Sequence, residues 1–177
     1  MRGLPAYVAF AGLALAPFAS GCAAPARAEA MVPTDYVVLH RHSKSVAVTT
    51  AGGQETSGWG YSHIGNDALA AAITDALARS CVFASVVHGD DADYRLRVEL
   101  ISESPPASGM ESTFQLTAHW TLQDKAGSKL LDTDIASECH ASIHDAFVGV
   151  KRRQLQEEGA ACANIRLGIE RLSQLTL

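Results

Sequence analysis

Residues 94–100 read YRLRVEL, and residues 113–122 read TFQLTAHWTL. In both stretches apolar and polar side chains alternate, which is the period of a strand that buries one face. Residues 124–127, with the sequence DKAG, form a turn that leads into a third expected strand over residues 129–137. Strands that follow one another along the chain in this way predict an antiparallel sheet with one apolar and one polar face.

Two helices are expected beside these strands. The first covers residues 64–77, where apolar side chains recur at steps of three and four residues. The second begins near Asp145 and carries an apolar stripe, so that Glu157, Arg166 and Glu170 are expected to stay in water. The stripe consists of Leu155, Cys162, Ile165, Ile169 and Leu172.

Shorter apolar runs complete the set of elements. Residues 36–39 and 46–48 are expected strands before the first helix, and residues 82–87 are a candidate edge strand after it. The resulting order is β-α-(β)-β-β-β-α. The sequence therefore predicts an α+β fold, a two-layer sandwich in which an antiparallel sheet of four or five strands carries both helices on one face.

The composition is that of a globular protein. The 177 residues carry 14 Lys+Arg against 19 Asp+Glu, a formal net charge of −5, and 47% of them are hydrophobic. These values exclude a disordered or collagen-like chain, and the acidic balance argues against nucleic acid as a partner. No internal repeat is visible, so residues 35–177 are expected to form a single domain.

The N-terminus has the features of a secretory signal. Arg2 precedes an uncharged apolar stretch over residues 4–18, which is too short to span a bilayer. Residues 19–22, with the sequence ASGC, resemble the lipobox of bacterial lipoproteins, although Ala19 stands where Leu is usual. The resemblance implies a signal peptide over residues 1–21 and a lipidated Cys22 as the first residue of the mature chain.

The same resemblance bears on the location of the protein. Ala23 after the lipidated cysteine implies sorting to the outer membrane, on its periplasmic side, with membrane lipid as the partner of Cys22. Residues 22–34 are rich in Ala and Pro, so they are expected to form the lipidated N-terminus and a flexible tether. A cut after Ala30, which follows the A-x-A pattern of ordinary secretion, remains an alternative.

Several segments of the mature chain resemble one family. They are GGQET at residues 52–56, DAFVGVKR at 145–152, EGAA at 158–161 and NI at 164–165. Together they resemble a family of uncharacterised proteobacterial lipoproteins, which implies an envelope address and an α+β fold but no activity. The order of elements is also similar, as a fold only, to auxiliary lipoproteins of lipid transporters and lipoprotein activators of cell-wall synthases.

Three cysteines remain once Cys22 is assigned to lipid, namely Cys81, Cys139 and Cys162. Cys81 ends the first helix, and in an antiparallel meander that end lies at the same pole as the end of the third strand. A disulfide between Cys81 and Cys139 is therefore expected, with three reduced thiols as the alternative. A Cys139–Cys162 bridge is disfavoured, because Cys162 would lie about 25 Å along a helix that starts next to Cys139.

No catalytic or metal-binding motif is present. Cys139, His140 and His144 are residue types found in zinc and copper sites, but no CxxC or HExxH spacing supports such a site. Ser62 and His63 are adjacent, yet the chain lacks the GxSxG elbow of a serine hydrolase. We therefore expect no catalytic residue, no bound metal and no cofactor.

Candidate partner contacts lie in two places. Trp59 and Tyr61 belong to a Gly-rich loop, and amphipathic aromatic side chains are favoured in interfaces. The polar face of the predicted sheet supplies Arg95, Arg97 and His119. Each group also has an ordinary interpretation. Trp59 and Tyr61 would fold back onto the core, and the polar face of the sheet would simply be solvated.

The sequence therefore predicts a non-enzymatic, lipid-anchored periplasmic protein that binds an envelope component during assembly, transport or maintenance of the cell envelope. One alternative is a lipoprotein that carries a small ligand or metal with the help of Trp59 and the histidines. Another is an envelope enzyme whose site has no recognisable motif. The basic run KRR at residues 151–153 is expected to lie in water, with contact to anionic lipid head groups or to a partner carboxylate as the alternative.

Overall fold

The structure is a computed structural model that describes residues 23–57, 61–89, 91–104 and 111–177. Trp59, Cys22 and the expected signal peptide lie outside the described residues. The elements follow in the order η1 (Ala28–Met31), β1 (His42–Ala51), α1 (Asn66–Ser80), β2 (Phe83–Val86), β3 (Tyr94–Ser104), β4 (Glu111–Asp124), β5 (Lys129–Ser142) and α2 (Gly149–Ser173).

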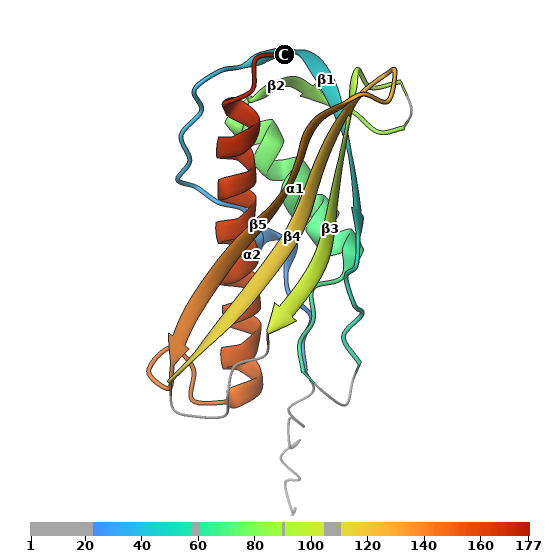
Figure 1. Cartoon of the computed structure of the whole chain (residues 1–177). Helices are drawn as coiled ribbons and strands as arrows, with labels where there is room; N and C mark the ends of the chain where they lie inside the picture. Colours follow the sequence, from blue (N-terminus) through green and yellow to red (C-terminus); the bar gives the residue numbers. More distant parts are fainter. Residues whose placement is uncertain (1–22, 58–60, 90, 105–110) are drawn as a thin grey trace, which may run out of the picture.

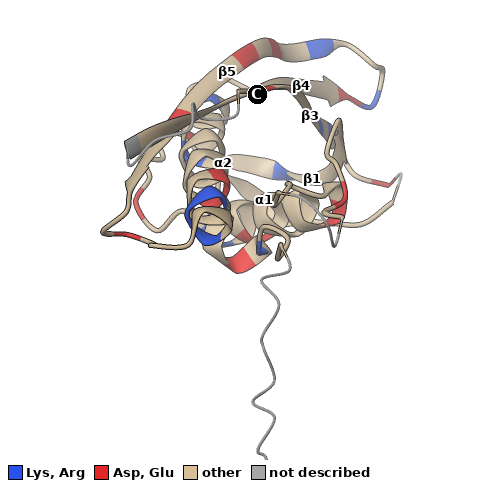
Figure 2. Ribbon diagram, turned by 90° about the horizontal axis from the view of Figure 1, so that it is seen from below, with Lys and Arg blue, Asp and Glu red and all other residues tan. Residues whose placement is uncertain are grey.

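The expected α+β fold class is confirmed. The five described strands form one sheet, and both helices pack against the same face of it (Figures 1 and 2). α2 lies along β4 and β5, whereas α1 covers β1 and β2. In β3 the buried side chains of Leu96 and Val98 alternate with the exposed side chains of Arg95 and Arg97, so the predicted polar outer face is present.

The sheet is mixed, and the expectation of a purely antiparallel sheet is wrong. Its strand order is β2-β1-β3-β4-β5, with β1 parallel to both β2 and β3 and the rest antiparallel. The reason is α1, because a helix between two strands returns the chain to its starting end and makes the strands parallel. β2 pairs with β1 as far as Val46, and β3 pairs with it from Val46 to Ala51.

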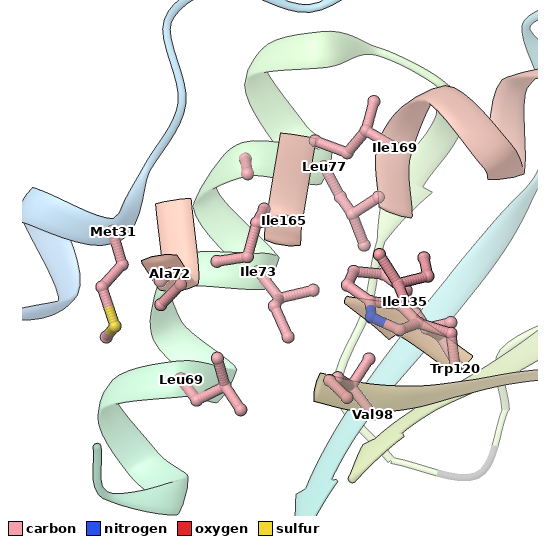
Figure 3. Close-up of a cluster of buried hydrophobic side chains, with 14 of the residues drawn as sticks. Met31, Leu69, Ala72, Ile73, Leu77, Val98, Trp120, Ile135, Ile165 and Ile169 are labelled. Atoms are coloured by element: carbon pink, nitrogen blue, oxygen red, sulfur yellow. The ribbon is translucent and has the colours of Figure 1, made fainter. Parts of the chain in front are cut away.

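The core lies between the sheet and the helices, and Figure 3 shows its central side chains. Trp120 of β4 is fully buried under Gly168 of α2, where a Cβ would overlap the indole ring. The Trp120 Nε1 donates a hydrogen bond of 2.9 Å to Oδ1 of Asn164. Asn164 Nδ2 donates in turn to the Ile135 carbonyl at 2.8 Å, so one side chain attaches α2 to both β4 and β5.

Residues 25–33 do not form the flexible tether that their composition predicted. Met31 is fully buried against α1, and Ala26 and Val32 are buried as well (Figure 3). A segment this short carries no helical or strand period, so no local pattern indicates that it packs on the core. One turn of 3-10 helix is enough to place Met31 in the core.

The same segment is attached to α2 by polar contacts. The Arg27 backbone N and Nε both donate to the Glu158 carboxylate at 3.0 Å. Gln154 Nε2 donates to the Pro25 carbonyl at 2.8 Å. The described chain therefore starts on the N-terminal half of α2 rather than at a distance from the domain.

α2 begins at Gly149 rather than near Asp145. Asp145 instead closes a turn, in which its Oδ2 accepts hydrogen bonds from the Ser142 backbone N at 2.8 Å and from Ser142 Oγ at 2.9 Å. Residues 143–148 thus connect β5 to α2 as a loop. None of the helices in the described residues is both long enough and apolar enough to cross a membrane.

Candidate functional site

A cavity of about 380 Å³ opens where β1 and β3 end and α2 begins. Because β1 and β3 are parallel, the segments that follow them meet at the same edge of the sheet. The polar part of the lining comes from Gln54, Tyr61, His63, Glu103 and Arg153. We call this cavity the Arg153 pocket.

Arg153 brings a positive charge into the interior beside the pocket. Its Nε lies 2.6 Å from Oε1 of Glu157, one helical turn further along α2, and Glu157 is fully buried. The guanidinium carbon lies 5.1 Å from the ring centre of Phe114 and 5.3 Å from that of Tyr61. The two rings and one carboxylate therefore hold the cation in place, and this geometry favours cation–π attraction.

A second carboxyl group faces the same cation. Glu103 Oε2 lies 3.9 Å from His63 Nδ1, which is an ion-pair distance and beyond hydrogen-bond range. Burial raises the pKa of Glu103, and the nearby His63 and Arg153 only partly oppose the shift. Burial likewise raises the pKa of Glu157 in spite of its contact with Arg153.

Polar atoms in this cluster are incompletely paired. Within the described residues, four buried side-chain atoms have no hydrogen-bond partner, and all four lie here: Ser62 Oγ, His63 Nδ1, Glu103 Oε1 and Glu157 Oε2. More than nine in ten buried polar groups in proteins are paired, so such a concentration needs an explanation. Glu103 lines the pocket, so its unpaired oxygen suits a donor from outside, such as an ammonium, guanidinium or amide N–H group. Glu157 is fully buried and faces Ser62, whose hydroxyl partly opposes the rise in the pKa of Glu157.

The arrangement offers no nucleophile with an adjacent base. Ser62 Oγ is fully buried and makes no hydrogen bond to His63, so adjacency in sequence does not become a catalytic pair. Within the described residues, no group of three or more His, Cys, Asp or Glu side chains is placed to hold a metal ion. Cys139 and His140 are neighbours in β5 and therefore point to opposite faces of the sheet.

The structure separates the predicted partner contacts. Tyr61 lies at the Arg153 pocket with 63% of its surface exposed, whereas Arg95, Arg97 and His119 lie on the outer face of the sheet. Arg97 Nη2 pairs with Glu99 at 3.0 Å. Among the members of this set that the structure describes, only Tyr61 lines the pocket, and Trp59 lies outside the described residues.

His119 on the outer face is held between two carboxylates. Its Nδ1 lies 2.6 Å from Asp134 and its Nε2 lies 2.8 Å from Asp132, both on the neighbouring strand β5. The hydrogen bonds to Asp134 and Asp132 raise the pKa of His119 above its usual range. Lys129 also pairs with Asp132, at 2.7 Å, so the charges on this part of the sheet largely satisfy one another.

The expected Cys81–Cys139 disulfide is not formed, and all three described cysteines are free. Cys81 follows α1 and comes two residues before the start of β2, which pairs with His42 at the start of β1. Cys139 pairs with Phe114, one residue beyond the register of the last residue of β3. The two cysteines are thus separated by the whole length of β3, about 35 Å. The reason is that the C-terminal end of α1 and the end of β5 lie at opposite ends of the sheet.

Cys139 instead faces α2. Its Sγ occupies the position where a Cβ of Gly159 would lie, and Cys162 follows one helical turn later. The expectation that Cys139 and Cys162 lie far apart is therefore wrong. The loop over residues 143–148 reverses the chain, so that α2 runs back along β5 and brings Cys162 towards Cys139. Burial raises the pKa of both thiols, which keeps them protonated.

Sequence reasoning missed the residues that build the pocket. It placed Arg153 and Glu157 in water, since charged side chains are usually exposed. The helical period of α2 could have revealed them. Glu157 is two turns before Asn164 and Arg153 is one turn before Glu157, so all three lie on the face that carries the apolar stripe. Glu103 and His63 carry no such signal, since their burial depends on which strands end together.

No protein-family model matches the sequence, and no curated protein matches it either. Solved structures do match the fold. A protein from Xanthomonas campestris assigned to the DUF330 family is 10% identical, with a TM-score of 0.55 over 80% of this chain and 87% of the other. A hypothetical protein from Chlamydia trachomatis is also 10% identical, with a TM-score of 0.52 over 74% and 96% of the two chains.

A third match is a protein from Caulobacter crescentus described as a lipoprotein. It is 17% identical, with a TM-score of 0.51 over 73% of this chain and 88% of the other. At these identities the comparisons establish shared architecture and not shared chemistry. The chain is therefore similar in fold to these three bacterial proteins, one of which is described as a lipoprotein.

Proposed function

We propose that this protein is a lipid-anchored, periplasmic accessory lipoprotein that binds an envelope partner through the Arg153 pocket and performs no reaction. The observation that carries the proposal is the incomplete pairing of Glu103 and His63, two of the residues that line that pocket. A partner that presents an N–H donor to Glu103, with a flat group against Tyr61, would complete the pairing. Its role would lie in assembly, transport or maintenance of the cell envelope.

The docked N-terminal segment supports lipidation at Cys22. The alternative cut after Ala30 would remove Arg27 and leave the Glu158 carboxylate, only 4% exposed, without its guanidinium partner. It would also place a charged α-ammonium on Met31, which is fully buried. A cut before Cys22 keeps both contacts, and the fold likeness to a protein described as a lipoprotein agrees with it.

Anchoring is tested by Cys22→Ser. We expect the wild-type protein to sediment with the outer membrane, whereas the variant is released into the periplasmic fraction or retained unprocessed in the inner membrane. Unchanged fractionation of the variant would contradict the anchor.

Partner binding is tested by photo-crosslinking in cells. A benzoylphenylalanine at Tyr61, on the rim of the pocket, is compared with one at Arg97, which is exposed on the outer sheet face. We expect one dominant envelope adduct from position 61, lost when Glu103→Gln is added, and none from position 97. Adducts with abundant envelope proteins alone, at both positions, would contradict the proposal.

A second candidate function is the binding of a small polar ligand. The cavity volume of about 380 Å³ lies within the range of small-molecule sites. In that case the purified protein shows a rise in thermal midpoint with one class of amine or amide compound, and Glu103→Gln abolishes the rise. Crosslinking at Tyr61 then yields no protein adduct.

A further inference from the structure

The point at which the lipid anchor leaves the domain is fixed by the docked segment. Gln154, in the second turn of α2, holds the Pro25 carbonyl, and Cys22 is three residues before Pro25. Three extended residues reach at most about 11 Å. The far end of α2, at Ser173, lies 19 residues beyond Gln154, which is about 28 Å of helix. Cys22 therefore stays at the end of the domain where α2 begins.

That end also exposes apolar side chains. Phe147 is 90% exposed and Val148 is 59% exposed, and both lie in the loop between β5 and α2. In Figure 1 this loop lies at the lower end of the molecule, beside the first turn of α2. Single exposed apolar side chains are common on protein surfaces, whereas adjacent ones, such as Phe147 and Val148, form a patch of the kind found at contacts with proteins or membranes.

The loop is held in this conformation on both sides. The Ser142–Asp145 turn fixes its first half, where the Asp145 and Ala146 backbone N atoms also donate to the Ser142 carbonyl. Arg152 Nη1 donates to the Ala146 carbonyl at 3.0 Å and fixes its second half. The exposure of Phe147 is thus the result of a braced loop rather than of missing contacts.

The charges beside the loop suit a lipid surface. Lys151 is exposed in the first turn of α2, and Arg152 follows it (Figure 2). Of the acidic groups near this end, Glu158 is neutralised by its ion pair with Arg27, whereas Asp145 keeps its negative charge because its hydrogen bonds from Ser142 lower its pKa. Basic side chains next to exposed apolar ones favour the interface of a bilayer with anionic head groups.

We infer that this end of the domain rests on the bilayer, with Phe147 and Val148 inserted at the head-group boundary and Lys151 and Arg152 facing anionic phosphates. The inference rests on the anchoring of Cys22 proposed above. Under this inference the protein contacts the membrane through its surface as well as through the lipid, and the N-terminal end of α2 is the end that faces the bilayer.

The test uses the full lipidated protein reconstituted in vesicles of phosphatidylethanolamine and phosphatidylglycerol, with and without brominated acyl chains that quench tryptophan. Phe147→Trp reports on the anchored end. Leu39→Trp is the matched control, because Leu39 is 60% exposed and its backbone N is bonded to Ser173 at the other end of α2. The native tryptophans give the same background in both variants.

We expect bromine to reduce the signal of the introduced tryptophan by about half in Phe147→Trp and to leave that of Leu39→Trp unchanged. Adding Lys151→Glu to Phe147→Trp is expected to weaken the quenching, and more so in phosphatidylglycerol-rich vesicles.

Flotation of the protein with the vesicles separates the two proposals. A protein that floats but shows no quenching of Phe147→Trp, or equal quenching of both variants, overturns the membrane contact and leaves the anchor intact. A protein that does not float overturns the anchor and the contact together.

Discussion

The two halves of α2 bury polar side chains in opposite ways. In the C-terminal half, Asn164 accepts from Trp120 and donates to Ile135, and none of its polar atoms is left without a partner in the described chain. In the N-terminal half, Arg153 pairs with Glu157, but one oxygen of that carboxylate has no partner there. A fully paired polar group stabilises a fold, whereas an incompletely paired buried one costs stability.

Replacing Asn164 should have the largest effect on the paired half. Asn164→Ala leaves Trp120 Nε1 and the Ile135 carbonyl without partners in a dry core. We expect the free energy of unfolding, measured in urea, to fall by about 2–4 kcal/mol. Arg166→Ala on the same helix, which loses only a partly exposed pair with Glu170, is the control and should change it by less than about 1 kcal/mol. Equal losses for Asn164→Ala and Arg166→Ala would mean that the buried Asn164 hydrogen bonds stabilise the fold no more than an exposed ion pair does.

Gly168→Ala should have the next largest effect. Its Cβ would overlap the ring of the buried Trp120, so the indole or α2 must shift. We expect a loss of about 1–3 kcal/mol, measured as above. Gly149→Ala is the matched control, because its Cβ would meet only the Arg152 guanidinium at 4.0 Å. If Gly168→Ala leaves the free energy of unfolding unchanged, Trp120 does not pack this closely against Gly168.

Glu103→Gln should act with the opposite sign, because Glu103 of β3 lines the pocket beside the incompletely paired N-terminal half of α2. The raised pKa of Glu103 means that the folded state holds its proton more tightly than the unfolded state does. Stability therefore falls as pH rises through the window from the ordinary value, near 4.5, up to the raised one. We expect Glu103→Gln to flatten this fall and to increase stability at pH 7 by less than about 1 kcal/mol.

Thermal unfolding between pH 4 and 7 checks the Glu103 prediction. Loss of stability at pH 7 in Glu103→Gln, comparable to that of Asn164→Ala, would mean that Glu103 is as well paired as Asn164 and would end the distinction between the halves.

The smallest effect is expected at His119 on the outer face. Its pKa is raised by Asp134 and Asp132, so its contribution to stability is present below pH 6.5 and is lost as pH rises through the raised value. NMR titration of the His119 ring should give a midpoint above 6.5, and Asp134→Asn should lower it. A midpoint that Asp134→Asn does not change would contradict the pairing. Because this site is exposed, the thermal midpoint should change little.

The sequence predicts local structure well where side chains repeat. The alternation in residues 94–100 and 113–122 locates β3 and β4 and assigns Arg95, Arg97 and His119 to the outer face. It does not predict the direction of β1, because strand pairing is decided by the helix that separates β1 from β2. The alternation shows which face of one strand is buried. Whether that strand runs parallel or antiparallel to its neighbours depends on the connections between them, which the alternation does not show.

The pocket could be predicted only in part. The period of α2 already pointed inward at Arg153 and Glu157, but the ordinary preference of charges for water favoured the wrong assignment. Glu103 and His63 meet because parallel β1 and β3 end at one edge of the sheet, which no local pattern shows. The docking of Met31 is likewise set by one turn of chain against a core that is built elsewhere.

The docking of residues 25–33 also determines what the domain can meet. Cys22 is only three residues before the docked Pro25, so the lipid proposed at Cys22 would confine the search for a partner to the plane of the membrane. The Ala26 backbone N is bonded to the His63 carbonyl at 3.2 Å, so the Arg153 pocket is carried close to the plane of the anchor. A partner held in the same membrane is then encountered at its surface density, and even a weak contact at the pocket gains from the raised effective concentration.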